Sequence, residues 1–251
     1  MLRIATMLIA STIVFSSFAK DAHDPLDLDK FEFPAPRQSE LGKSLTLWAT
    51  YYYLPEVNEA QGGTIPLRDM QGQEIGPRMS LKNWCDTAME GSVKVNMMDG
   101  DVKTFNYQGV TNDYVVDCTS IYPRHKAIGR TKYRVANGVY GDGLDDYILS
   151  PYRTFATDVN YITPGTALYV PEARGAKITT PTGRVITHDG YFFAADKGGA
   201  IKGSHVDVYI GTSKKAPFFP WIGSKESKTF KAFIVKDQKV IQDLLELHTI
   251  K

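Results

Sequence analysis

The stretch ADKGGAIKGSHVDVYIG, residues 195–211, places an aspartate on each side of a glycine-rich turn. Its second half alternates apolar and polar residues, so Asp207 and Tyr209 share one face of a predicted strand. That face borders either solvent or a groove, and the alternation is compatible with both. Asp196 has a structural interpretation as well as a chemical one, because an aspartate just before two glycines often accepts backbone N–H groups in a tight loop.

Most of the remaining chain consists of short segments rich in β-branched and aromatic residues, separated by glycine and proline turns. The predicted strands lie within residues 44–55, 92–98, 102–109, 113–118, 153–158, 167–172, 190–196, 205–211 and 229–235, and residues 176–186 are predicted to form a hairpin. Helices are predicted only within residues 80–91 and 237–247, and residues 119–150 are predicted to form a long ordered loop. This pattern indicates a mainly β protein, a barrel with peripheral strands and loops and one or two short helices.

Residues 1–19 have the features of a secretory signal peptide: one early arginine, an apolar core from Ile4 to Val14, and a Ser-Phe-Ala sequence ending at Ala19. The apolar core is shorter than the roughly 18 residues of a membrane span. The alternative is that this segment stays attached as an N-terminal anchor helix. A lipoprotein is not expected, because no cysteine lies near the cleavage point. We expect a periplasmic or secreted protein without a membrane anchor.

Residues 20–42 form a predicted extended leader, in which acidic side chains outnumber basic ones and three prolines occur. The formal net charge of the whole chain is +1, although residues 201–236 are rich in lysine. Such a lysine-rich face attracts an anionic polymer or is simply solvated. Nucleic acid is not an expected partner of an exported protein.

Cys85 and Cys118 are the only cysteines, and an even count in an exported chain predicts one disulfide between them. The alternative, a cysteine nucleophile, lacks a nearby histidine partner because the five histidines are scattered along the chain. For the same reason no pair of His or Cys residues has metal-ligand spacing. We expect neither a metal nor another cofactor.

Three segments resemble the three-aspartate (3D) domain, and most closely the barrel of the lytic transglycosylase A family: TFATDVNYITPGTALYV (154–170), AADKGGAIKGSHVDVYIG (194–211) and TFKAFIV (229–235). The family has an Asp before an Ile-Pro-x-Gly turn, then Asp-x-Gly-Gly-Ala-Ile-Lys-Gly, then His-x-Asp-x-Tyr-x-Gly. Here Asp196 and Asp207 are separated by 207 − 196 = 11 positions with GGAIKG intact between them. TYYYLP (50–55) resembles the family's Thr-x-Tyr-Tyr-x-Pro segment.

This resemblance implies a double-psi β-barrel that binds and cleaves the glycan strands of peptidoglycan. The catalytic aspartate of the family falls on Asp207, with Asp196 as its acidic neighbour. The residues expected to contact the substrate are Thr50, Tyr52, Asp158, Lys202 and Tyr209. We predict that residues 43–251 form a single barrel domain and that the protein is a monomer. An insertion at about residues 60–150 departs from the longer family members.

A lytic transglycosylase can use one carboxyl group, because the C6 hydroxyl of muramic acid attacks its own C1. Asp207 would then protonate the glycosidic oxygen and afterwards accept the C6 hydroxyl proton. Cleavage of the MurNAc–GlcNAc β-1,4 bond would give 1,6-anhydromuramic products. Two alternatives stay open: a hydrolase on the same scaffold that uses water, and a non-catalytic, expansin-like module that binds cell-wall glycan. Fold analogy alone does not separate these functions.

Overall fold

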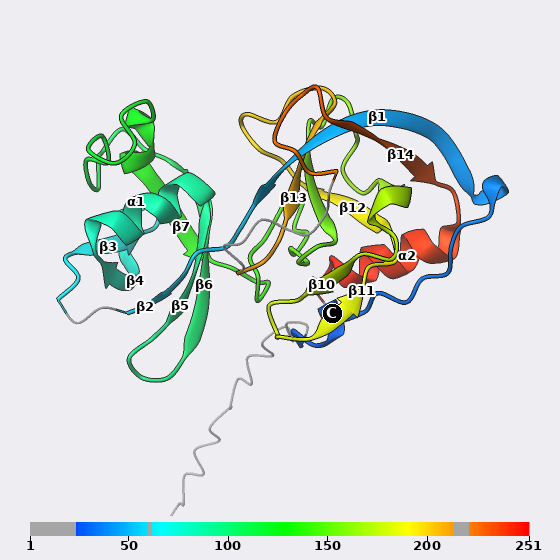
Figure 1. Cartoon of the computed structure of the whole chain (residues 1–251). Helices are drawn as coiled ribbons and strands as arrows, with labels where there is room; N and C mark the ends of the chain where they lie inside the picture. Colours follow the sequence, from blue (N-terminus) through cyan, green and yellow to red (C-terminus); the bar gives the residue numbers. More distant parts are fainter. Residues whose placement is uncertain (1–23, 60–61, 213–220, 251) are drawn as a thin grey trace, which may run out of the picture.

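The computed structural model describes residues 24–59, 62–212 and 221–250 of the chain. Its helices and strands form two groups, a barrel and a smaller sheet, which Figure 1 shows side by side with β1 (Leu41–Tyr52) leading from one toward the other. The predicted signal peptide, residues 1–19, lies outside the described residues. No helix within the described ranges is long and apolar enough to cross a membrane.

Six strands form a closed barrel in the order β1, β13, β8, β12, β9, β14. The other five strands are β8 (Thr154–Thr157), β9 (Ala167–Tyr169), β12 (Tyr191–Asp196), β13 (His205–Tyr209) and β14 (Thr229–Val235). The pairs β1–β13 and β8–β12 are parallel, and the other four pairs are antiparallel. All six strands overlap segments predicted as strands, so the mainly β barrel is confirmed.

The period-2 alternation of β13 is the reason for its orientation in the barrel wall. Val206 and Val208 are fully buried in the barrel core, where the stacked rings of Phe155 and Phe192 lie 4.2 Å apart. Successive side chains of a strand point to opposite faces. Asp207 therefore lies on the face of β13 that points away from this core.

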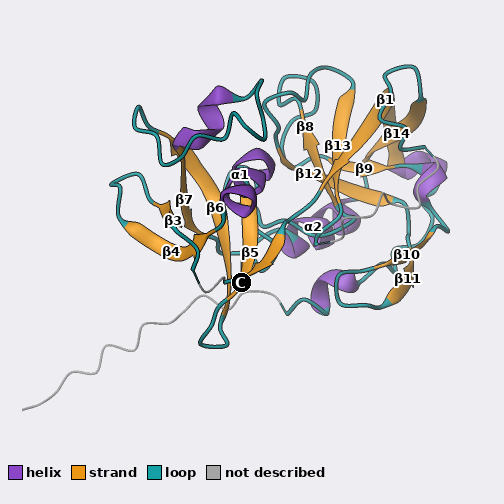
Figure 2. Ribbon diagram, turned by 60° about the vertical axis from the view of Figure 1, so that its left-hand side comes forward, coloured by secondary structure: helices purple, strands orange, loops and turns teal. Residues whose placement is uncertain are grey.

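The second group of strands is a four-stranded sheet in the order β2 (Glu56–Asn58), β5 (Ser92–Asn96), β6 (Val102–Val110), β7 (Thr131–Val135). It has its own core of fully buried side chains, including Trp84 and Phe105. The hairpin of β3 (Ile65–Arg68) and β4 (Glu74–Met79) and the helix α1 (Leu81–Glu90) pack around it, as Figure 2 shows. The predicted disulfide between Cys85 and Cys118 is confirmed, and it ties α1 to the segment before β7.

Helix α1 begins and ends where its sequence predicts. The Ser80 hydroxyl accepts a hydrogen bond from the backbone N–H of Asn83 at 3.3 Å, which satisfies one of the free amides of the first turn. Gly91 ends the helix with a φ of 84°, a left-handed conformation that glycine adopts without steric cost. The C-terminal end of α1, Glu90, is thereby placed at a defined point beside β5.

Parts of the secondary-structure prediction for the sheet are wrong. Residues 113–118, predicted as a strand, are irregular because the N–H groups of Val115 and Val116 bond to the carbonyl of Gly129 instead of to a neighbouring strand. The predicted loop at 119–150 contains the short helix η3 (Lys126–Arg130) and strand β7. Residues 56–79, where no strand is predicted, contain the short strands β2, β3 and β4.

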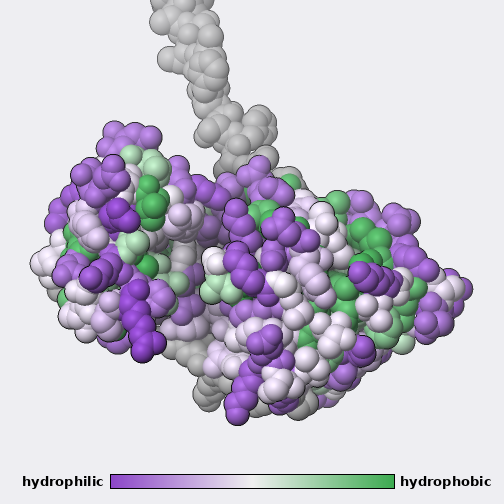
Figure 3. Space-filling view, turned by 90° about the horizontal axis from the view of Figure 1, so that it is seen from above, coloured by the Kyte–Doolittle hydropathy of each residue, from purple (hydrophilic) through white to green (hydrophobic). Residues whose placement is uncertain are grey.

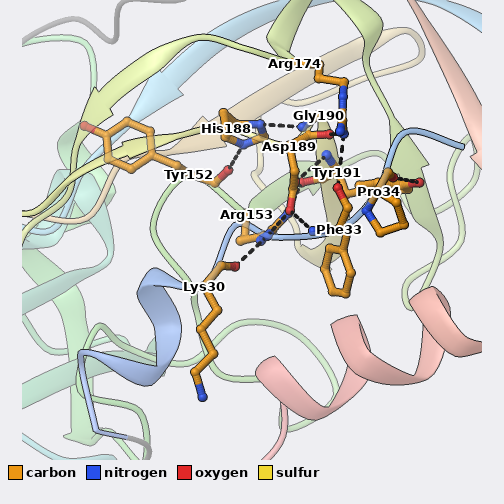
Figure 4. A network of polar contacts seen from close by, with 10 residues as sticks. All are labelled: Lys30, Phe33, Pro34, Tyr152, Arg153, Arg174, His188, Asp189, Gly190 and Tyr191. Carbon is orange, nitrogen blue, oxygen red and sulfur yellow. Dashed lines mark hydrogen bonds and ion pairs between the residues drawn. The ribbon is translucent and has the colours of Figure 1, made fainter.

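Residues 24–40, within the predicted leader, pack onto the barrel through two short 3₁₀ helices, η1 (Asp27–Asp29) and η2 (Gln38–Glu40), and the segment between them. Arg153 is fully buried and donates two hydrogen bonds to Asp189, at 2.6 and 2.7 Å, and one to the carbonyl of Lys30 at 2.7 Å. The ring of Phe31 lies 4.0 Å from the guanidinium carbon. Figure 4 shows this network, which joins the N-terminal segment to the barrel.

The remaining elements cover the lower side of the barrel in Figure 1. Helix α2 (Gln238–Leu247) begins at Asp237, whose carboxylate accepts two backbone N–H bonds, and buries Val240 and Leu244 against the outside of β9 and β12. The predicted hairpin is confirmed as β10 (Lys177–Thr179) and β11 (Val185–Thr187), and the 3₁₀ helix η4 (Pro171–Ala173) follows β9.

Candidate functional site

The parallel pairing of β1 with β13 organises the candidate site. Its register makes three lateral pairs on one face of the barrel wall: Trp48 with His205, Thr50 with Asp207, and Tyr52 with Tyr209. The intervening residues of both strands pack into the barrel core. A row of polar and aromatic side chains therefore crosses two strands that lie far apart in the sequence.

Asp207, at the middle of this row, is a largely buried carboxyl group that accepts one hydrogen bond from the part of the chain that the structure describes. The hydroxyl of Thr50 donates to its Oδ1 atom at 2.7 Å. Burial raises the pKa of Asp207 to about 6, the Thr50 bond opposes this rise, and the negative charge of Asp196 adds a smaller increase. Such a carboxyl group can hold a proton close to neutral pH and also release it.

Asp196 is the second acidic group of the site, and its surroundings differ from those of Asp207. Tyr52 donates its phenolic O–H to Oδ2 at 2.7 Å, and the backbone N–H of Lys197 donates to Oδ1 at 2.8 Å. Burial raises the pKa of Asp196 to about 6, while both hydrogen bonds act in the opposite direction. The turn-cap interpretation holds only for the bond from Lys197, because the other oxygen is bound to a side chain of β1.

A cleft of about 590 Å³ lies between the barrel and the four-stranded sheet. The barrel contributes Tyr52, Asp196 and Lys202 to its walls, and the opposite side contributes Glu90 and Tyr107. The surface in Figure 3 is hollowed between the smaller and the larger part of the molecule. The cleft combines carboxyl groups with aromatic rings, a combination suited to a polar ligand with apolar faces, such as a sugar.

A second pocket, of about 540 Å³, adjoins the other end of the row of side chains. Trp48, His205 and Glu226 line it, and Lys202 lines both this pocket and the cleft. Because Asp207 lies between the pairs Trp48–His205 and Tyr52–Tyr209 along the strands, it lies between the two hollows. An extended ligand that followed both would pass Asp207.

Glu90 is a candidate residue that the sequence analysis missed. It ends α1 and lines the cleft opposite the barrel. The pKa of Glu90 is raised to about 7, mainly by burial, which a backbone hydrogen bond from Tyr53 opposes and to which the negative charge of Asp207 adds. No local motif distinguishes this glutamate from others in the chain. It reaches the cleft because α1 packs beside β5 and because Tyr53, the residue after β1, hydrogen-bonds to it.

Residues 153–218 match the family model described as the 3D domain. The segment that contains Asp158, Asp196 and Asp207 is therefore similar to a 3D domain. No curated protein matches the chain. Among solved structures, the fold is similar to E. coli MltA with bound chitohexaose, with a TM-score of 0.52 and 16% sequence identity over 76% of this chain and 72% of that chain. It is also similar to a membrane-bound lytic murein transglycosylase from Agrobacterium tumefaciens, with a TM-score of 0.50 and 12% identity over 78% of this chain and 76% of that one. The expected double-psi β-barrel is therefore confirmed.

The three aspartates of the 3D domain have different surroundings. Asp207 and Asp196 belong to the site, whereas both carboxylate oxygens of Asp158 accept backbone N–H bonds, from Gly203 at 2.9 Å and Asn160 at 3.1 Å. These bonds lower the pKa of Asp158. The geometry thus shows Asp158 tying the turn before β13 to the loop after β8, and the residues that line the cleft do not include it.

Of the other residues expected to contact the substrate, some line the two hollows and others do not. Lys202 of the 3D domain lines both hollows, and Tyr52 from outside the domain lines the cleft. Tyr209 is fully buried and donates its O–H to the carbonyl of Tyr140 at 2.7 Å, so its side chain supports Tyr52 from behind and does not reach the cleft. Thr50 contacts Asp207 directly. The described residues hold no group of three His, Cys, Asp or Glu side chains arranged to bind a metal.

Proposed function

We propose that this protein is a peptidoglycan lytic transglycosylase that cleaves the MurNAc–GlcNAc β-1,4 bond with Asp207 as its single catalytic carboxyl group. The observation that carries this proposal is the combination of the position of Asp207, its hydrogen bond and its raised pKa. It lies between two hollows of the surface, its one donor is Thr50, and burial raises its pKa to about 6. A general acid is most effective when its pKa lies near the working pH.

In the proposed reaction, protonated Asp207 donates its proton to the glycosidic oxygen as the bond to C1 of the muramic acid breaks. The resulting carboxylate then accepts the proton of the C6 hydroxyl group, and the C6 oxygen bonds to C1 to close the 1,6-anhydro ring. One carboxyl group serves as acid and then as base, and no water is consumed. The Thr50 hydroxyl stabilises the intermediate carboxylate by its hydrogen bond.

The comparisons support this proposal at the level of fold and of ligand class. MltA, whose fold this chain shares, binds the oligosaccharide chitohexaose. The cleft and second pocket offer rings of Tyr52, Tyr107 and Trp48 beside the carboxyl groups. We infer that the protein acts as a monomer on peptidoglycan outside the cytoplasm. The signal-peptide features and the disulfide, which is stable in oxidising compartments, support that location.

A hydrolase on the same scaffold is the second candidate, and Glu90 is the observation that favours it. Glycoside hydrolases usually use two carboxyl groups that flank the scissile bond, one as acid and the other as base or nucleophile. Glu90 faces the barrel from the other wall of the cleft, where the charge of Asp207 acts on it. In such an enzyme a water molecule, and not the C6 hydroxyl, would attack C1.

Mass spectrometry of purified peptidoglycan after digestion separates these functions. We expect soluble fragments with 1,6-anhydromuramic ends, each one water lighter than the corresponding reducing-end fragment, and none with the Asp207→Asn variant. Reducing ends would overturn the proposal in favour of the hydrolase. Binding to peptidoglycan without any soluble fragment would overturn it in favour of the expansin-like binding module.

A further inference from the structure

The hydroxyl group of Thr50 contacts two titratable side chains at once. Its Oγ1 atom lies 2.7 Å from Oδ1 of Asp207 and 2.8 Å from Nε2 of His205. Both neighbours come from β13, and the parallel register that pairs Thr50 with Asp207 places His205 diagonally beside it. The three groups therefore form one hydrogen-bonded chain across the two strands.

A threonine hydroxyl carries one proton and can donate only one strong hydrogen bond, while its lone pairs accept others. An ionised carboxylate only accepts. When Asp207 is ionised, Thr50 must donate to Oδ1, and its contact with His205 is then satisfied only if Nε2 carries a proton and donates to Oγ1. When Oδ1 of Asp207 holds a proton, Thr50 is free to turn and donate to Nε2.

The ring of His205 is held in a fixed orientation. It stacks on Trp48 with ring centroids 3.6 Å apart and an interplanar angle of 6°. Burial lowers the pKa of His205, which favours a neutral ring with a single N–H, and the backbone carbonyl of Ala200 competes with Thr50 for that N–H. The charged groups near it are Lys202 and Glu226, which line the same pocket.

The ionised form of Asp207 has few other means of stabilisation. Thr50 is the only protein donor to its carboxylate among the described residues, and the nearby titratable groups are Asp196, Glu90 and the phenol of Tyr52. None of these carries a positive charge that would favour the ionised form. The chain through Thr50 is thus the one polar connection by which the protein favours the carboxylate.

We propose that His205 is a positioning residue of the site: its Nε2–H orients the Thr50 hydroxyl toward Oδ1 and so stabilises the carboxylate form of Asp207. This inference rests on the proposed function, in which Asp207 becomes a carboxylate in the middle of each turnover. His205 also lines the second pocket, but in this role it touches none of the reacting atoms. It acts on Asp207 only through Thr50.

The first test measures the ionisation of Asp207 without relying on activity. Carboxyl-carbon NMR titration of protein labelled at aspartate would follow Asp207, assigned with the Asp207→Asn variant. In His205→Phe, which keeps a ring against Trp48 but has no N–H, we expect the pKa of Asp207 to rise by about half a unit to one unit. In His205→Gln, whose amide N–H can donate to Thr50, we expect less than half of that rise. An unchanged or lowered pKa of Asp207 in a folded His205→Phe protein would overturn the proposal, and a lowered value would mean that Nε2 accepts the Thr50 proton.

The second test uses the steady-state kinetics of a double-mutant cycle. We expect His205→Phe to lower kcat about 3- to 10-fold at nearly constant KM and to move the alkaline limb of the pH profile to higher pH. Thr50→Val should have at least as large an effect, and His205→Phe should add nothing in the Thr50→Val background. Additive losses, or a raised KM with an unmoved limb, would show that His205 contacts the substrate and would overturn the proposal.

The two tests also distinguish this inference from the proposed function. If the wild-type protein releases no anhydromuramic product but the NMR titration shows the expected shifts, the hydrogen-bonded chain is correct and the proposed function is wrong. If the product forms but the pKa of Asp207 is the same with and without His205, the proposed function is correct and the role of His205 is wrong.

Discussion

A single carboxyl group needs a particular environment to serve as acid and then as base. Asp207 has that environment because burial disfavours its charged form, while one hydrogen bond from Thr50 keeps the carboxylate accessible. The two influences leave its pKa at about 6, where both forms are populated close to neutral pH. Whether this group is catalytic is a question that substitution of one residue can answer.

We predict that Asp207→Asn lowers the rate of anhydromuramic product release at least about 100-fold, since it removes the proton-transferring group while nearly preserving shape. The melting temperature and the affinity for glycan should change little. Product release and thermal unfolding, measured on the same preparation, provide the check. A folded variant with near-normal activity would exclude Asp207 as the catalytic acid.

The effect of Asp196 on the pH profile is a second prediction at this scale. The charge of Asp196 raises the pKa of Asp207, so Asp196→Asn should lower that pKa, and the alkaline limb of the rate profile should move to more acidic pH. Because burial is the larger cause of the raised pKa, we expect the limb to move by well under the full difference from an ordinary aspartate. Activity should fall at neutral pH and recover partly in mild acid.

Asp158→Asn is the matched control for this experiment. It also removes a carboxylate of the 3D domain, but its bonds to Gly203 and Asn160 are structural. We expect a loss of roughly 1 kcal/mol in the free energy of unfolding and an unmoved limb. If Asp196→Asn behaves in the same way, electrostatic tuning by Asp196 is excluded.

Among the elements, the N-terminal segment depends on an ion pair that is removed from water. Arg153 and Asp189 are both buried, and the guanidinium group also binds the carbonyl of Lys30 and faces the ring of Phe31. Breaking a buried pair leaves an unpaired charge, which costs more than the pair contributes. This network thus couples the stability of residues 24–40 to that of the barrel.

We predict that Arg153→Met lowers the free energy of unfolding by about 3–5 kcal/mol, because it leaves the carboxylate of Asp189 buried without its partner. It should also open residues 24–40 to limited proteolysis. Urea-induced unfolding measures the first effect and mass mapping of the cut sites the second. Lys239→Met, which breaks an exposed ion pair with Asp243, is the control and should change neither quantity appreciably. Equal effects of the two variants would contradict the prediction.

At the scale of the whole molecule, the candidate site belongs to neither part of the structure alone. The barrel supplies Asp196 to one wall of the cleft and Asp207 beside it on β13, and the group around the four-stranded sheet supplies Glu90 and Tyr107 to the other wall. The division of residues 43–251 into one barrel with an insertion at about 60–150 stays a prediction. A ligand that fills the cleft must contact both sides. A side chain that obstructs the cleft should therefore weaken ligand binding while leaving the stability of the protein nearly unchanged.

Gly199 provides a test of this arrangement. It lines the cleft, and a Cβ atom built on it would meet no other atom within 4 Å. We predict that Gly199→Trp raises KM about tenfold, equivalent to about 1.4 kcal/mol of lost binding, while the melting temperature stays close to that of the wild type. Gly199→Ala, the control, should keep a normal KM. A normal KM for Gly199→Trp would mean that the substrate does not occupy this cleft.

The sequence by itself determined what depends on neighbouring residues. The alternation in residues 205–211 placed Asp207 on the polar face of its strand, Ser80 and Gly91 marked the ends of α1, and the two cysteines predicted their disulfide. These features follow from the two-residue period of a strand, from the free amides at a helix end and from the fact that two cysteines can form only one disulfide. The motif residues also indicated a resemblance to a double-psi β-barrel, the fold that the solved structures share.

Only the tertiary structure decided which of these residues meet. Thr50 and Asp207 are 157 positions apart and become neighbours because β1 pairs in parallel with β13. Tyr209 shares a strand face with Asp207, yet it is buried because Tyr140 covers it. Glu90 reaches the cleft only through the packing of α1. A local pattern determines which way a side chain points from its strand or helix, whereas the exposure, partners and pKa of that side chain depend on distant segments that the pattern does not contain.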